Sequence, residues 1–281
     1  MSDDPKSEGP NRDGANRDGP DADWLGAPGS AAPPDPTRSA RGPGKPALPK
    51  RFYAEAALGE HAGGFRLTLD GRPANTPARN PLALPTRALA EGVAAEWAAQ
   101  IDVIDPSRMP LTRLANTAID GVAPRREAVV DDLSAYAGTD LLAYRAGDPD
   151  RLVQAQAEAW DPVLDWAHEA LGARFILGEG VMHVTQPDTT VAALRRAIGE
   201  TDGPFRLAAL HTLTTLTGSL VLALAVLRGR LTPAQAWTAA HVDETYQASV
   251  WGQDEEAAAR QAQRRAEFDA AAHLSALSDA G

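Results

Sequence analysis

The sequence predicts an α+β protein, in which a small N-terminal α/β domain of sheet and helix precedes a mainly α-helical bundle domain. Two observations carry this prediction. Shortly after residue 50, apolar and polar residues alternate, whereas beyond residue 110 the apolar residues recur at helical spacing. A third observation is the proline- and glycine-rich start of the chain. We therefore expect a disordered tail at 1–48, a sheet-plus-helix domain at 49–110 and a helical domain at 111–281.

The tail is predicted to be disordered because it cannot bury enough apolar surface to offset the entropy of ordering the chain. It contains the near-repeat NRDGANRDGP. It has no apolar core of a signal peptide, and its eight acidic residues are unusual for a transit peptide. Trp24, within DWLG, is either an incidental residue or a short docking motif.

The N-terminal domain begins with a strand signal. In GGFRLTLDGRP, the apolar residues Phe65, Leu67 and Leu69 alternate with polar ones, and a turn follows at DGRP. Thr86 is well placed to cap the next helix. That helix carries one apolar stripe, formed by Leu89, Val93, Trp97 and Ile101. We expect Trp97 to be a structural residue that ties the helix to the sheet.

The helical domain opens with LTRLANTAIDGV, which directly follows Pro110. One face of this helix is predicted to be apolar, with Leu111, Leu114, Ala115, Ala118 and Val122. A neighbouring face is polar, with Arg113, Asn116, Thr117 and Asp120. Another helical segment is expected from Arg125 to Tyr136.

The stretch GDPDRLVQ predicts the start of a longer helix, with Asp148 as the cap and Pro149 at the first helical position. This helix should continue towards Leu171, with a kink or break at Asp161–Pro162. RFILGEGVMHV is then a small hairpin or an irregular connector. A short helix is expected from Thr189 to Ile198.

An apolar helix is expected from Phe205 to Leu227. Its segment Leu207–Leu227 has no charged residue and approaches the length that a bilayer requires. However, the first half of that segment holds His211 and several threonines. We therefore interpret it as a buried helix in the middle of the bundle, with a membrane span as the alternative.

The stretch RLTPAQAW contains the clearest helix start in the chain. Thr232 is the predicted cap, Pro233 is the first helical residue, and Gln235 completes a capping box. This helix should run to Trp251 and end at Gly252. Asp254 then opens a last, polar helix that extends towards Leu277.

Composition restricts the classes of partner. The chain has 281 residues and a formal net charge of −11, which argues against binding to nucleic acid or to anionic lipid. It contains no cysteine, so disulfides, thiolate metal ligands and cysteine nucleophiles are excluded. We expect a monomer that does not insert into a membrane.

Enzyme motifs are largely missing from the sequence. TGSLV lacks the second glycine of a nucleophile elbow, and HEALG lacks the second histidine of a zinc protease motif. On a helix, His241 shares a face with Glu244, but two ligands do not make a structural zinc site. The sequence therefore predicts no catalytic residue, no metal and no cofactor.

The segment AAHVDETYQASVWGQDEEAAAR contains the main candidate site. If it is one helix, Trp237, His241, Glu244, Ala248 and Trp251 form one narrow stripe. Glu244 would then lie between two tryptophans. Two interpretations are open: a structural salt bridge from Glu244 to Arg113 or Arg206, or an exposed acidic anchor within an aromatic binding patch. An alternative function is a soluble enzyme that uses the polar face of Arg113, Asn116 and Asp120 together with Glu244.

Several stretches resemble the ATP12 family, the assembly chaperones of the F1 sector of ATP synthase. They span Lys50 to Glu267 and include KRFYAEAAL, MPLTRLANTAIDGV, YAGTDLLAYRA, WDPVLDWA, TTLTGSLVLALAV and AWTAAHVDETYQASVWGQDEEAAAR. The resemblance implies a non-enzymatic protein that binds the free F1 α subunit and keeps it from aggregating until it pairs with β. It also implies a bacterial cytoplasmic setting, whereas eukaryotic relatives act in the mitochondrial matrix.

The family has a functionally important acidic residue in its C-terminal region. Carried to this chain, the resemblance indicates Glu244 first, with Glu255 and Glu256 as alternatives. The full set of candidate partner-binding residues is Glu244, Trp251, Trp237, Asp243, Glu255 and Glu256. Trp97 matches a tryptophan of the family's N-terminal domain, and its loss is expected to act through folding.

Overall fold

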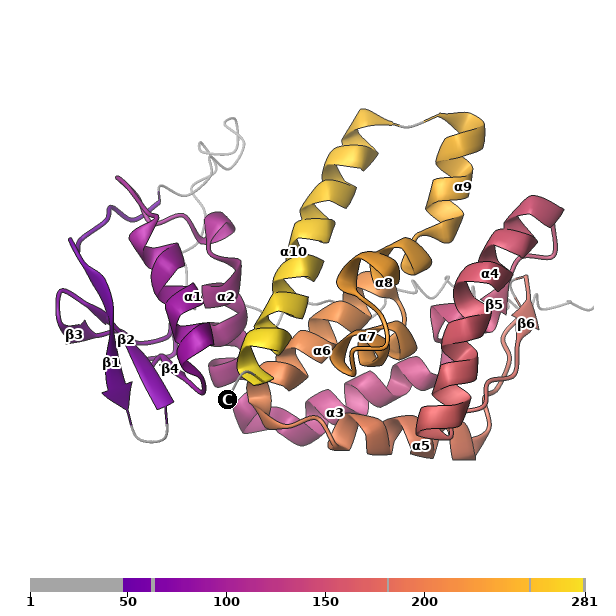
Figure 1. The fold of residues 1–281 in the computed structure, drawn as a ribbon, viewed down its shortest axis with the longest axis horizontal. Helices are drawn as coiled ribbons and strands as arrows, with labels where there is room; N and C mark the ends of the chain where they lie inside the picture. Colours follow the sequence, from indigo (N-terminus) through magenta and orange to yellow (C-terminus); the bar gives the residue numbers. More distant parts are fainter. Residues whose placement is uncertain (1–47, 62–63, 181, 253, 280–281) are drawn as a thin grey trace, which may run out of the picture. The chain divides into compact units, whose positions relative to one another are not determined.

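The computed structural model describes residues 48–61, 64–180, 182–252 and 254–279 (Figure 1). The tail predicted at 1–48, with Trp24, lies outside the described residues except for Leu48. The described residues belong to one compact unit that spans residues 46–281. The predicted domain boundary near residue 110 therefore stays a prediction. The predicted class is confirmed, because a small sheet near the N-terminus is followed by a helical domain.

The sheet is built around one strand. Strand β1 (Ala56–His61) pairs antiparallel with β2 (Gly64–Leu69), and both β3 (Arg72–Pro73) and β4 (Ala83–Leu84) also pair with β2. The predicted alternation is confirmed, since Leu67 and Leu69 are buried. The predicted turn forms at Asp70 and Gly71, which both adopt positive φ angles.

Helix α1 (Arg87–Ala98) covers the sheet. Thr86 caps it as predicted, because its hydroxyl accepts a hydrogen bond from the amide of Leu89. The predicted apolar stripe is only partly correct. Trp97 is half-buried against the core and its carbonyl accepts a hydrogen bond from Tyr53, but Ile101 is 72% exposed. The helix ends at Ala98, so Ile101 lies beyond the stripe.

Helix α2 (Pro110–Asn116) continues directly into a π-helical segment, Thr117–Val122, and α3 (Arg126–Ala135) follows. Of the predicted apolar face, Leu114 is half-buried and four residues are buried: Leu111, Ala115, Ala118 and Val122. Glu96 of α1 fixes the start of α2, because its carboxylate accepts the amides of Leu111 and Thr112.

Helix α4 (Asp150–Trp166) continues as a π-helical segment, Ala167–Leu171. The predicted cap is wrong: Pro149 occupies the capping position, and no side chain accepts a hydrogen bond there. Asp148 lies one residue too early. Of the predicted kink or break, the break is absent, because the chain stays helical through Pro162. The buried side chains of Trp160 and Val163 hold the helix to the core on both sides of the proline.

The described residues of the connector after α4 do not form a hairpin. Strand β5 (Tyr144–Arg145) pairs in parallel with β6 (Gly178–Glu179), and the residues around β6 are irregular. Helix α5 (Asp188–Gly199) confirms the prediction of a short helix.

The apolar segment forms two helices rather than one. Helix α6 (Gly203–Thr217) ends where Gly218 adopts φ +69°, and α7 (Leu220–Leu227) begins under a cap from Ser219. Both helices line the core, so the buried interpretation is confirmed. In the described part of the chain, no helix combines the length and apolarity that a membrane span needs.

Among the last three helices, the first two are separated by a break at His241. Helix α8 (Pro233–Ala240) has the predicted capping box, α9 (Val242–Trp251) ends at Gly252 as predicted, and α10 (Glu255–Asp279) packs along α6 (Figure 1). The prediction of one helix from Thr232 to Trp251 is wrong, because the chain breaks at His241.

The side chain of His241 competes with the helical backbone at the break. Nδ1 of His241 donates to the carbonyl of Trp237 at 2.8 Å, and the backbone N–H of His241 bonds instead to Thr238. The imidazole therefore occupies the acceptor that an uninterrupted helix would offer to the backbone.

Candidate functional site

The candidate site is a pair of helical segments that leaves the core. It comprises α9 and the part of α10 before Phe268, residues 242–267, which we call the arm. In Figure 1 both segments extend beyond the other helices of the bundle, and the distance between them widens towards it. None of the described residues of the arm is buried. This contrasts with the second half of α10, where Phe268, Ala271 and Leu274 lie in the core.

The end of α9 exposes large apolar side chains. Trp251 is 85% exposed and its neighbour Val250 is 52% exposed. Gly252, with φ +86°, ends the helix directly after them. A tryptophan fully in water gains nothing from folding, whereas tryptophan is enriched among the residues that dominate binding energy. The arm thus presents an apolar anchor that no described residue of the chain covers.

The base of the arm is fixed by a different tryptophan. Trp237 is only 8% exposed, stacks on His241 with ring centroids 3.9 Å apart, and contacts Phe268 at 5.3 Å. The predicted stripe through Trp237, Glu244 and Trp251 therefore does not form. The break at His241 separates the two tryptophans, so that Trp237 lies in the core and Trp251 in solvent.

Glu244 is exposed on α9. Within the described part of the chain it forms no ion pair, and neither predicted salt bridge is present. Arg113 instead faces Glu267 at 3.8 Å, and Arg206 pairs with Asp279 at 2.7 Å. The structural interpretation of Glu244 is thus wrong, which leaves its carboxylate available at the surface.

The other acidic candidates differ in their surroundings. Glu255 and Glu256 are exposed in the first turn of α10, where Glu256 pairs with Arg260. Acidic residues in this position also favour the helix through its dipole. Asp243 is only half-exposed, and its carboxylate accepts a hydrogen bond from Nε2 of Gln156 at 2.7 Å.

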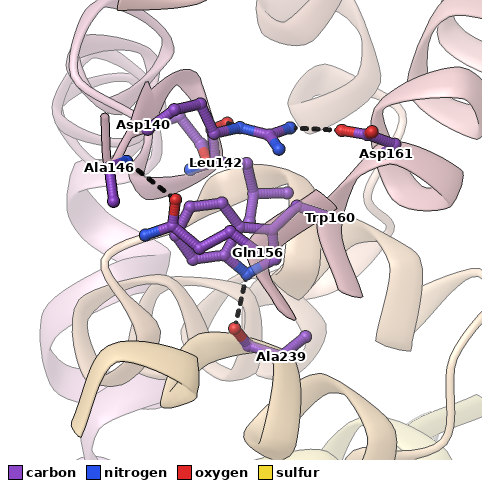
Figure 2. Close-up of polar contacts among 8 residues, drawn as sticks. Asp140, Leu142, Ala146, Gln156, Trp160, Asp161 and Ala239 are labelled. Atoms are coloured by element: carbon purple, nitrogen blue, oxygen red, sulfur yellow. Dashed lines mark hydrogen bonds and ion pairs between the residues drawn. The ribbon is translucent and has the colours of Figure 1, made fainter. Parts of the chain in front are cut away.

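Sequence reasoning missed the residues of α4 that support the arm. Gln156 is 2% exposed, and its Oε1 accepts the amide of Ala146 at 2.8 Å (Figure 2). One turn later, Nε1 of Trp160 donates to the carbonyl of Ala239 at 2.7 Å (Figure 2). The sequence did contain a signal for this support, because Gln156 is a polar residue four positions before a tryptophan on the buried face of its helix.

The same region of α4 also contacts Arg145, which precedes the helix in the chain. The guanidinium of Arg145 lies 5.2 Å from the ring of Trp160 and pairs with Asp161 at 2.7 Å. Helix α4 therefore connects the end of β5 and Ala146 to α8 and α9 through adjacent side chains.

The polar face proposed for an enzyme is used for structure. The carboxylate of Asp120 accepts hydrogen bonds from Thr76, Ala78 and Asn80, which ties the sheet domain to the helices. Glu244 takes part in none of these contacts. Asn116 has a buried Oδ1 without a hydrogen-bond partner among the described residues. Hollows of about 480 and 390 Å³ are lined by neither Asp120 nor Glu244.

Two carboxyl groups have raised pKa values, and both lie outside the arm. Burial raises the pKa of Asp140 to about 6, against hydrogen bonds that favour the charged form. Its two oxygens accept the amides of Leu142 and Val221, each at 3.1 Å. Burial likewise raises the pKa of Glu96, which fixes the start of α2. Both groups join elements of the fold, and neither faces the arm's exposed residues.

The described residues contain no group of three or more histidine, aspartate or glutamate side chains that could hold a metal ion. His241, which shared a predicted face with Glu244, directs its Nδ1 to a backbone carbonyl instead.

Comparisons with known proteins agree on one family. A family model described as ATP12 chaperone protein matches residues 50–168. Atp12 from Paracoccus denitrificans is 47% identical, with a TM-score of 0.78 over 82% of this chain and 98% of that chain. A variant of the same protein with one aspartate replaced by lysine is 46% identical over the same shares, also with a TM-score of 0.78.

A third solved structure extends this agreement to another bacterium. The Atu1473 protein of Agrobacterium tumefaciens, described as a chaperone candidate, is 50% identical, with a TM-score of 0.79 over 82% of this chain and 86% of that chain. Such identity across most of the chain far exceeds what a shared fold alone produces. The chain belongs to the ATP12 family of chaperone proteins.

Proposed function

We propose that the chain is an assembly chaperone that binds the unassembled α subunit of the F1 sector of ATP synthase. It holds that subunit in a soluble form until the β subunit pairs with it. Membership of the ATP12 family supports a chaperone role. The observation that carries the proposal is the arm, which places Trp251 in solvent beyond a bundle whose core is already complete without it.

The chemistry of the arm suits this task. A free subunit exposes interface that its partner normally covers, and such apolar patches lead to aggregation. Trp251 and Val250 offer an apolar anchor for a patch of this kind. Glu244, Glu255 and the neighbouring Asp254 add a rim of negative charge, which accelerates binding to a basic surface and selects against acidic ones.

Release requires no chemical step in this scheme. If β covers the same surface of α more extensively, it displaces the chaperone by competition, and the rate of exchange follows the dissociation rate. We therefore propose a binding protein without catalytic activity, acting in the bacterial cytoplasm. The polar face at Asp120 gives no specific support to the alternative of an enzyme, because its carboxylate is fully engaged in joining the sheet to the helices.

The test is capture and protection of purified F1 α subunit. The wild-type chain should retain the α subunit in a pull-down and suppress its light scattering on warming. Glu244→Lys should weaken both effects, because it reverses a charge in the rim. The matched control is Glu60→Lys, an equal charge change on an exposed residue of β1, which should leave both unchanged. Failure of the wild-type chain to retain the α subunit would refute the proposal.

A further inference from the structure

The two segments of the arm are held differently. The α10 segment is continuous with the half of that helix that lies in the core, and its Arg265 also lies over the ring of Trp237. Helix α9 contributes no buried residue, and it follows a break at which His241 leaves helical geometry (φ −119°, ψ 30°). Its direction is therefore not set by an uninterrupted helix, and within α9 only Val242, next to the break, packs against the core. What remains is its packing on α4, and the hydrogen bond from Gln156 to Asp243 lies within that packing.

The preceding helix is held much more firmly. The carbonyl of Ala239 accepts Nε1 of Trp160, and Trp237 is enclosed between His241 and Phe268. Helix α8 is thus anchored up to the residue before the break. Beyond it, the first polar contact from α4 to α9 is the one that Gln156 makes to Asp243.

Gln156 is well suited to fix the direction of α9. Its side chain is almost completely buried, and both ends of its amide are used: Oε1 accepts Ala146, and Nε2 donates to Asp243. An amide fixed at one end by a backbone N–H presents its other end at a defined angle. A buried donor that loses its partner costs more than an exposed one, so the arrangement favours one position of α9.

We infer that Gln156 is a positioning residue that sets the direction of α9, the first segment of the arm, through Asp243, while the neighbouring Glu244 is free to contact the partner. The inference rests on the proposed function where it speaks of the partner, but the position of the arm can be measured without one. It assigns two adjacent acidic residues to different tasks. Asp243 acts as a hydrogen-bond acceptor, and Glu244 acts through its charge.

The two roles predict different effects of substitution on the position of α9. Asp243→Asn keeps an oxygen that can accept from Nε2 of Gln156, so it should preserve the position of α9. Asp243→Leu and Gln156→Leu remove the hydrogen bond and should release α9. Glu244→Leu is the matched control, because Glu244 is exposed and forms no ion pair within the described residues.

The arm is observed directly by spin labelling, which the absence of cysteine makes straightforward. Labels on cysteines introduced at the exposed Gln247 of α9 and at Asp165 on α4 report their separation by pulsed electron resonance. The distance distribution should broaden or shift in Gln156→Leu and Asp243→Leu and stay unchanged in Asp243→Asn and Glu244→Leu. Asp243→Leu keeps the test valid if Gln156→Leu fails to fold. An unchanged distribution in Asp243→Leu overturns the inference.

Binding to purified F1 α subunit is measured in parallel on the unlabelled variants. Asp243→Leu should bind roughly tenfold more weakly, since the competent position of the arm is populated less, and Asp243→Asn should restore wild-type affinity. If Asp243→Asn binds as weakly as Asp243→Leu while the arm keeps its position, Asp243 acts through its charge and the inference is wrong. If the distances respond as expected but the wild-type chain binds no α subunit, the positioning role stands and the proposed function fails.

Discussion

Two helices predicted as continuous are broken in the structure, at Gly218 and at His241, and the two breaks have opposite consequences. After Gly218 the chain turns back into the core, where α7 is buried along most of its length. After His241 it leaves the core, and α9 contributes no buried residue. The first break divides an apolar segment into two helices that both lie in the core. The second carries a tryptophan away from the core and so makes it available for binding.

The largest expected effect is a loss of stability on replacing Trp237, the tryptophan before the second break. Trp237→Ala should lower the free energy of unfolding by about 3–5 kcal/mol, because it leaves a cavity between His241 and Phe268. Urea denaturation followed by circular dichroism measures this loss. A loss below about 1 kcal/mol would mean that Trp237 is not part of the core and that the two sides of the break are alike.

The break at Gly218 is supported by a buried carboxyl whose charge should affect stability. The pKa of Asp140 is raised to about 6 in the folded state, above its value of 3.8 when unperturbed, so the folded protein binds the proton more tightly than the unfolded chain does. Stability from this group is therefore fully present below pH 4 and is lost as the pH rises to about 6. The loss is on the order of 3 kcal/mol.

Asp140→Asn isolates this contribution from the other carboxyl groups. The free energy of unfolding of the wild-type chain, relative to that of the variant, should fall between pH 4 and pH 7. Chemical denaturation at several pH values gives the two curves. A wild-type advantage that grows with pH would show that the amide donors of Leu142 and Val221 outweigh burial.

Trp251, the tryptophan after the second break, should control binding rather than stability. Trp251→Ala should weaken binding to the F1 α subunit by about 2 kcal/mol, or roughly thirtyfold, while stability changes by less than about 0.5 kcal/mol. Calorimetric titration and urea denaturation of the same preparation provide both numbers. Equal losses of stability and binding would contradict the separation of roles between Trp237 and Trp251.

The smallest expected effect is a loss of stability from the backbone conformation of Gly218 at the first break. Gly218→Ala should cost about 1 kcal/mol, because φ +69° is unfavourable for a residue with a Cβ, although the nearest atom, Cβ of Leu141, leaves room at 3.9 Å. Thermal unfolding is sensitive enough to detect it. A stabilised variant would imply that the chain can continue from α6 into α7 as one helix.

Sequence reasoning predicted what depends on local chemistry. The strand at Leu67 and Leu69, the caps at Thr86 and Thr232, and the helix end at Gly252 are fixed by neighbouring residues and were all predicted correctly. The break at Gly218 also had a local signal, a glycine directly before a capping serine, but the apolar residues on both sides suggested continuity.

The break at His241 had no such signal. It depends on an imidazole that bonds to a carbonyl one turn earlier while stacking on a tryptophan that packs against Phe268 of α10. The support from Gln156 likewise depends on α4 and α9 meeting in space. Tertiary contacts of this kind cannot be deduced from helical periodicity, which is why the predicted stripe joined two tryptophans that the fold separates.

Photo-crosslinking from position 251 tests the central claim most directly. We predict that p-benzoylphenylalanine placed there crosslinks to the F1 α subunit, and that the same group at Phe52, an exposed aromatic residue of the N-terminal region, does not. Crosslinks to the α subunit from position 52 with none from position 251 would contradict the assignment of binding to the arm.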